Sequence, residues 1–242
     1  MPETDAIFDH LNDYSERPVQ AGVQRISLDC KATVKLGEYS RGGQTRGDNQ
    51  ALDHDMGQAD KAIPCGIVNE DSGALFLGFG RSGKTSDFIV DTLDCWWTHL
   101  TPQQRQETET IQIKVDNGSE SSGVRTQFLK RMVDWADKIG KTIHLLYFPP
   151  YHSKYNPIER CWGILELHWN GAKLIDWPTV IAWAKTMTWK GEHPTIYENQ
   201  THYQTGISLS KAEMRPVEKR LERHPTLPKW DIWIRPQAKV LS

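Results

Sequence analysis

The sequence predicts an α/β fold in which helices flank a mixed five-stranded sheet, followed by a mostly helical, tryptophan-rich C-terminal extension. Two observations predict this class. The first eighty residues contain three apolar runs spaced as in an antiparallel meander, and from residue 85 onward helical and strand patterns alternate. At about 150 residues per domain, 242 residues suffice for one large domain or for one domain with an extension. We therefore expect a lead-in segment over residues 1–22, an α/β domain over 23–171 and the extension over 172–242.

Three strands are expected in the first part of the chain. Residues 23–29 have the composition of a strand that ends in a polar residue, Asp29. Two apolar runs, 63–68 and 74–79, are joined by five turn-forming residues, which is typical of a β-hairpin. Residues 35–60 are rich in glycine and charged side chains, and we expect a long loop there that can include a short strand.

Helices and strands alternate in the following part. Thr85 provides an N-cap for the first helix, Gly140 stops the second, and Asn156-Pro157 opens the third. The order of elements is that of a ribonuclease-H-like fold, although several other mixed folds share it. The expected elements are helices over 88–100, 124–139 and 156–169 and strands over 111–116 and 142–148.

Tryptophans are frequent in the expected extension. Trp177, Trp183 and Trp189 are six residues apart, a spacing that drifts around a helix and supports no repeat. Packing in the core is the interpretation that we favour for these rings. Trp230 and Trp233, each close to a basic residue, are the better candidates for the alternative, which is stacking on nucleic-acid bases.

Composition limits the class of protein and its compartment. No stretch approaches 18 consecutive apolar residues and the chain begins with acidic residues, so we expect neither a membrane-spanning helix nor export. The four cysteines include no CxxC pair, which excludes a zinc ribbon or thioredoxin-like site and fits a reduced cytosol. We expect a cytoplasmic protein.

Charge is unevenly distributed. The net charge of −2 alone predicts no nucleic-acid partner. Residues 1–140, however, carry 15 basic and 22 acidic side chains, whereas residues 141–242 carry 14 and 9, together with six of the nine histidines. This asymmetry is either chance or the sign of an acidic, metal-holding half beside a half that meets phosphate.

One nucleotide-binding motif occurs in the chain. Residues 78–85 match the P-loop pattern GxxxxGK[ST], in which Lys84 would reach the terminal phosphates. The preceding strand is expected to be the return arm of a hairpin, whereas a P-loop strand normally lies in a parallel sheet. A flexible glycine turn before a capped helix is therefore the interpretation that we favour, with a P-loop NTPase as an alternative.

Three carboxylates form a second, dispersed pattern. Asp29 ends the first strand, Asp116 ends the fourth, and Glu159 lies on the third helix. In the expected topology the first and fourth strands are neighbours, so that the three side chains converge and a divalent metal would relieve their repulsion. Each residue also has a plain structural explanation: Asp29 as a polar strand end, Asp116 in a turn, and Glu159 in a capping box with Asn156.

The motifs around these carboxylates resemble a known family. The run Asp116-Asn117-Gly118-Ser119 and the block FPPYHSKYNPIE over residues 148–159 resemble the catalytic core of DDE transposases. The likeness is to ISAzo-type insertion-sequence transposases, which share the mariner-like layout, and it extends over nearly the whole chain. It includes residues 26–31, 61–66, 88–91 and 203–206 and the tail with His224 and Trp230.

The resemblance implies a function and a site. Asp29, Asp116 and Glu159 would be the catalytic triad and would bind two Mg²⁺ ions, with Mn²⁺ as an alternative. The implied activity is metal-dependent cleavage and strand transfer of insertion-sequence DNA by a homo-oligomer in the bacterial cytoplasm, close to the nucleoid. Beside Glu159, the best candidates for contacts with DNA phosphates are His152, Lys154 and Arg160.

One departure from the family pattern affects this expectation. Transposases of this kind usually carry an N-terminal helix-turn-helix region, and only 28 residues precede Asp29. We therefore also expect that the chain is a fragment, a truncated copy or half of a split system. A non-catalytic, domesticated DNA-binding remnant is the corresponding alternative function.

Overall fold

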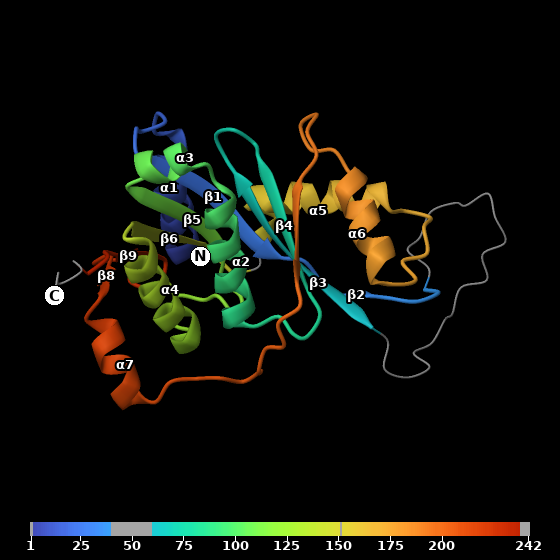
Figure 1. The fold of residues 1–242 in the computed structure, drawn as a ribbon. Coiled ribbons are helices and arrows are strands. Elements are labelled where there is room, and N and C mark those ends of the chain that lie inside the picture. Colours follow the sequence, from blue (N-terminus) through green and yellow to red (C-terminus); the bar gives the residue numbers. More distant parts are fainter. Residues whose placement is uncertain (1, 40–59, 151, 238–242) are drawn as a thin grey trace.

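A single mixed β-sheet with helices on both faces runs through the computed structural model, which describes residues 2–39, 60–150 and 152–237 (Figure 1). Within these residues the strands follow the order β7-β4-β3-β1-β5-β6-β9-β8, and β2 pairs with β3. Their bounds are β1 (Val23–Cys30), β2 (Val34–Lys35), β3 (Lys61–Asn69), β4 (Leu75–Gly80), β5 (Thr110–Asp116), β6 (Thr142–Phe148), β7 (Thr195–Asn199), β8 (Leu221–Arg223) and β9 (Asp231–Ile234).

The five strands predicted from the sequence form the centre of this sheet. β3 and β4 are the arms of the expected hairpin, and β3 also pairs antiparallel with β1. β1, β5 and β6 run parallel to one another. The predicted mixed sheet is therefore confirmed, and the first and fourth strands of the prediction, β1 and β5, are neighbours.

The expected number of strands and the expected nature of the C-terminal segment need correction. Four short strands extend the sheet beyond five, and three of them come from residues 172–237, which were expected to be mostly helical. β7 pairs with β4 at one edge, while β9 and β8 continue from β6 at the other edge. Strands of three to five residues are too short for a clear alternation of apolar and polar side chains, so the sequence pattern did not reveal them.

The helices confirm the predicted positions and caps. The Thr85 side chain accepts a hydrogen bond from the Phe88 N–H at the start of α2, and Gly140 ends α4 with φ of 67°. The helices are α1 (Pro2–Glu16), α2 (Ser86–His99), α3 (Pro102–Glu107), α4 (Thr126–Ile139), α5 (Pro157–His168), α6 (Trp177–Thr186) and α7 (Lys211–Glu218), with a short 3₁₀ helix at Ser153–Tyr155. Among the described residues no helix is long and apolar enough to cross a membrane.

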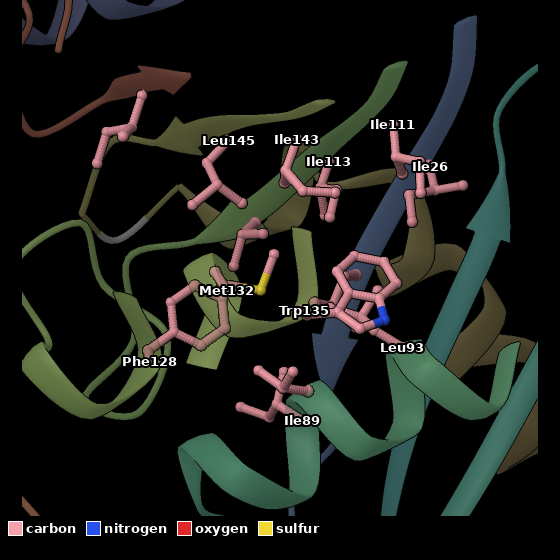
Figure 2. Close-up of a cluster of buried hydrophobic side chains, with 14 of the residues drawn as sticks. Ile26, Ile89, Leu93, Ile111, Ile113, Phe128, Met132, Trp135, Ile143 and Leu145 are labelled. Carbon is pink, nitrogen blue, oxygen red and sulfur yellow. The ribbon is translucent and has the colours of Figure 1, made fainter. Parts of the chain in front are cut away.

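One face of the sheet is covered by α2 and α4. Their apolar side chains pack against alternate residues of β1, β5 and β6, and most of the residues in this layer are almost completely buried. Figure 2 shows this cluster, which includes Ile89 and Leu93 from α2, Phe128, Met132 and Trp135 from α4, and Ile26, Ile111, Ile113, Ile143 and Leu145 from the strands.

The other face is covered by α5 and α6, which pack against β3 and β4, and by α1. The apolar patch of the lead-in segment is part of α1, where Ile7 and Leu11 are buried. Trp177, the first residue of α6, is buried in the core, as the packing interpretation predicts. Trp230 is also buried and donates its indole N–H to Glu3, so its ring cannot stack on a base in this conformation.

Candidate active site

Asp29 and Asp116 lie at the same edge of the sheet, near the carboxyl ends of two parallel strands. β1 and β5 pair in a register that places Leu28 opposite Val115, so that the next residue of each strand is an aspartate. Both aspartates are partly exposed. The negative charge of Asp29 acts on Asp116, which confirms that the topology brings these two carboxylates together.

Helix α5 provides a hydrogen bond to each aspartate. Asn156 Nδ2 donates to Asp116 Oδ1 at 3.0 Å, and Trp162 Nε1 donates to Asp29 Oδ2 at 3.0 Å. Residues 156, 159 and 162 are spaced three apart and therefore lie along one side of the helix. Glu159 stands between the two residues that hold the aspartates, and its charge also acts on Asp116.

The geometry of Asn156 does not support the capping-box interpretation of Glu159. Asn156 is the N-cap residue of α5, but its side chain makes no capping hydrogen bond. The N–H of Glu159 is bonded at 3.0 Å to the backbone carbonyl of Asn156 instead. The side-chain amide of Asn156 is directed at Asp116 and at the backbone carbonyl of Leu28, to which it donates at 3.2 Å.

Gly66 allows α5 to approach the sheet at this point. It lies opposite Asp29 in the antiparallel pairing of β1 with β3. A Cβ atom at Gly66 would lie 2.7 Å from the Trp162 ring and 2.8 Å from Ile158 Cδ1, closer than side chains tolerate. The missing side chain therefore makes room for the indole that reaches Asp29. No local sequence pattern indicates the contact between Gly66 and Trp162, because it joins segments almost a hundred residues apart.

The electrostatic environment disfavours a second negative charge beside Asp29. Burial raises the pKa of Asp116 to about 6, and the charges of Asp29 and Glu159 act in the same direction. The hydrogen bond from Asn156 and the nearby ammonium of Lys84 oppose this rise. The net direction is upward, mainly because Asp116 is partly buried.

A divalent metal fits this donor set by its chemistry. Carboxylate oxygens are the ligands that Mg²⁺ and Mn²⁺ prefer, and a cation would balance the charge that raises the pKa of Asp116. Among the described residues, however, no three acidic, histidine or cysteine side chains stand close enough together to form a complete metal-ligand cluster. The structure thus brings Asp29, Asp116 and Glu159 to one edge of the sheet, but their side chains are not close enough together to coordinate one ion.

The three basic candidates lie around the start of α5 in different environments. Lys154 and Arg160 are exposed, and within the described part of the chain no salt bridge occupies either of them. His152 is half-buried, with its ring edge-on to Phe8 at 5.2 Å and stacked at 6.1 Å on Tyr155. Lys154 and Arg160 are therefore available to an external anion, whereas His152 also packs against α1.

The P-loop motif has a packing explanation. β4 is the return arm of a hairpin, as expected, and it is antiparallel to β3. A Cβ atom at Gly78 would lie 2.8 Å from the Thr92 side chain, and one at Gly80 would lie 2.7 Å from Phe88. These glycines let α2 approach β4 closely. Lys84 points toward the carboxylates: its Nζ donates to the Cys30 carbonyl at 3.1 Å, next to Asp29.

The mixed sheet thus carries two acidic residues at the ends of neighbouring central strands and a third on a following helix, which is the arrangement expected of a DDE transposase domain. The family model described as "Rhodopirellula transposase DDE domain" matches residues 1–236, and the chain belongs to this family. The resemblance found in the sequence is thereby confirmed.

Of two similar solved structures, the one with the higher TM-score supports the same fold. One similar structure is the Mos1 transposase paired-end complex with the left transposon end, at 9% identity and a TM-score of 0.51, covering 74% of this chain and 51% of that chain. Another is the Mos1 strand transfer complex, at 8% identity and a TM-score of 0.48, covering 74% and 50%. The chain thus spans about half the length of these Mos1 chains. A comparison with curated proteins gave no match.

Proposed function

We propose that this chain carries the catalytic domain of an insertion-sequence transposase, which cleaves DNA and joins strands in a reaction that depends on a divalent metal. The observation that carries this proposal is the pair of hydrogen bonds by which Asn156 and Trp162, on either side of Glu159 in the sequence, bind Asp116 and Asp29. Membership of the transposase family supports the reaction class. The solved Mos1 complex with a transposon end supports DNA as the partner.

In this proposal the three acidic side chains bind the metal, and two further side chains position the aspartates. Asp29, Asp116 and Glu159 would hold Mg²⁺, as two ions, or Mn²⁺ instead. A divalent ion held there supplies a Lewis acid that activates a water or a DNA 3′-hydroxyl and stabilises the leaving oxygen of a phosphodiester. Asn156 and Trp162 keep the two aspartates at the edge of the sheet.

The basic residues around α5 would hold the DNA backbone. Lys154 and Arg160 are exposed and can neutralise phosphates on either side of Glu159, and His152 can add a hydrogen bond. Such contacts orient the duplex but do not read its sequence. Assembly of two or more copies on the DNA, in the cytoplasm near the nucleoid, belongs to the same proposal.

A nicking and strand-transfer assay on element-end DNA tests the function. We expect activity with Mg²⁺ or Mn²⁺, none with chelator, and none in Asp116→Asn, because the amide keeps the shape but loses the anionic ligand. Asp134→Asn is the matched control, since this exposed aspartate pairs with Lys130 on the surface of α4, away from the site. Wild-type cleavage in Asp116→Asn would contradict the mechanism.

Two other outcomes would favour the alternatives. DNA binding without any strand cleavage by the wild-type protein would favour the non-catalytic remnant. Cleavage that requires ATP and is insensitive to loss of Glu159 would favour a nucleotide-dependent enzyme instead.

A further inference from the structure

Lys84 is the part of the glycine-rich motif that packing of α2 on β4 does not explain. It lies between β4 and α2 at the acidic edge of the sheet. Its Nζ donates to the backbone carbonyl of Cys30 at 3.1 Å, and Cys30 directly follows Asp29 in β1. Lys84, Asp29 and Cys30 also line the same small cavity.

The carboxylates of Asp29 and Asp116 both act on this ammonium. Burial acts to lower the pKa of Lys84, whereas these two carboxylates are among the groups that raise it, and the net direction is upward. In return, the charge of Lys84 acts to lower the pKa of Asp116. The ammonium therefore lies close enough to the acidic edge for its charge to act on both aspartates.

The loop that carries Lys84 is held on both sides. On one side, Ser82 Oγ accepts a hydrogen bond from the backbone N–H of Tyr203 at 3.0 Å. On the other side, Ser86 Oγ donates to the backbone carbonyl of Glu120 at 2.7 Å. Thr85 caps α2 immediately after Lys84. These bonds fix the backbone around Lys84, and the loop therefore holds Lys84 close to the carboxylates.

We propose that Lys84 is a positioning residue: it is the resident counter-cation of the Asp29–Asp116 pair and competes with the divalent metal for these carboxylates. This inference rests on the proposed function, because it assumes that the two aspartates bind metal. It also gives Lys84 a role that a flexible glycine turn before a capped helix does not require.

Removal of the lysine charge should have two opposite effects. In Lys84→Met the apolar stem is kept and the charge is lost. Without metal, the carboxylates lose their partner, and we expect the midpoint of thermal unfolding in EDTA to fall by about 2–4 °C. With metal, the competing cation is absent, and we expect the Mn²⁺ dissociation constant to fall roughly tenfold, which corresponds to about 1.4 kcal/mol. If Lys84 only stabilised the fold, Lys84→Met would lower the unfolding midpoint without changing the Mn²⁺ dissociation constant.

Arg81 offers a matched control in the same loop. Its guanidinium lies 4.2 Å from the centre of the Trp177 ring, on the α6 side of the molecule. Arg81→Met therefore removes the same charge from the same loop without touching the carboxylates, and it should leave Mn²⁺ binding unchanged. Lys84→Arg keeps the charge and should retain the wild-type Mn²⁺ affinity. This variant separates the effect of the lost charge from the effect of a disturbed loop.

The measurement is titration with Mn²⁺, followed by electron paramagnetic resonance of the free ion, on the full chain. Tighter binding in Lys84→Met alone supports the inference. Equal affinity in wild type and Lys84→Met, or the same gain in Arg81→Met, overturns it while the proposed metal site survives. If the wild-type protein shows no Mn²⁺ binding that Asp116→Asn abolishes, the proposed function fails, and this inference fails with it.

Discussion

The Asn156 side chain offers the most direct test of how α5 holds the site. It is fully buried, at 0% exposure, and it donates one hydrogen bond to a carboxylate and one to a backbone carbonyl. Bonds of these two kinds contribute about 1.5–3 and 0.5–1.5 kcal/mol. Within the described structure, however, Asn156 Oδ1 is buried without a hydrogen-bond partner. Removing this unsatisfied oxygen offsets about 1–3 kcal/mol of the lost stability. We therefore expect Asn156→Ala to lower the free energy of unfolding by about 2 kcal/mol once the new cavity is included.

The assay is urea unfolding in EDTA, followed by tryptophan fluorescence. Asn170→Ala is the matched control, because this exposed asparagine follows the other end of α5 and should change stability by less than about 0.5 kcal/mol. A double-mutant cycle with Asp116→Ala isolates the bond between the two side chains, and we expect a coupling free energy of about 1–2 kcal/mol. Coupling close to zero would refute the claim that Asn156 holds Asp116.

The remaining predictions concern the carboxylates and the phosphate contacts. Trp162→Phe keeps an aromatic ring but removes the N–H that Asp29 accepts, so we expect unfolding free energy to fall by about 1–2 kcal/mol and strand cleavage to fall roughly tenfold. Because the pKa of Asp116 is raised to about 6 from 3.8, its stabilising contribution is complete below pH 3.8 and is lost as pH rises through 6. Urea titrations in EDTA should show the stability of wild type relative to Asp116→Asn falling by about 1–2 kcal/mol between pH 4 and 7, after solvent screening; a flat difference would contradict the shift. Lys154→Ala and Arg160→Ala should each reduce the slope of log affinity against log salt by about 1, equally for element-end and scrambled duplexes. Binding titrations across salt concentrations would contradict this if only the element-end duplex were affected.

The sequence predicted the elements whose signals are local and long enough. The three main helices follow from apolar residues at helical spacing and from Thr85 and Gly140 as end signals, and the structure keeps both caps. The adjacency of Asp29 and Asp116 follows from topology alone, because their two strands are parallel neighbours at the centre of the sheet. The strands β7, β8 and β9 were missed because each has only three to five residues, so that their pairing depends on a preformed sheet rather than on their own pattern.

The contacts that position the site could not be found in this way. Asn156 was interpreted as a cap residue, since its spacing from Glu159 fits a capping box, but its amide bonds to Asp116, 40 residues earlier. Lys84 fits a nucleotide motif by pattern, which was kept only as an alternative, and its ammonium contacts the residue after Asp29, 54 positions away. In both cases the decisive contact is long-range. A local pattern shows which contacts a side chain can make, and tertiary packing determines which of them it makes.

The packing of α5 explains why the acidic edge can exist before any metal binds. The helix buries Ile158, Cys161, Trp162 and Leu165 against the sheet, each with less than 5% exposure, so the apolar core fixes its rotation and its position along the axis. Once these residues are buried, Glu159 must lie toward the edge between Asn156 and Trp162. The repulsion among the carboxylates is then opposed by core packing, by two hydrogen bonds and by Lys84. It follows that chelation of metal should leave the protein folded, and that variants at Lys84 should change metal affinity without displacing the helix. Loss of α5 structure on chelation, seen by hydrogen exchange, would instead show that metal holds the helix in place.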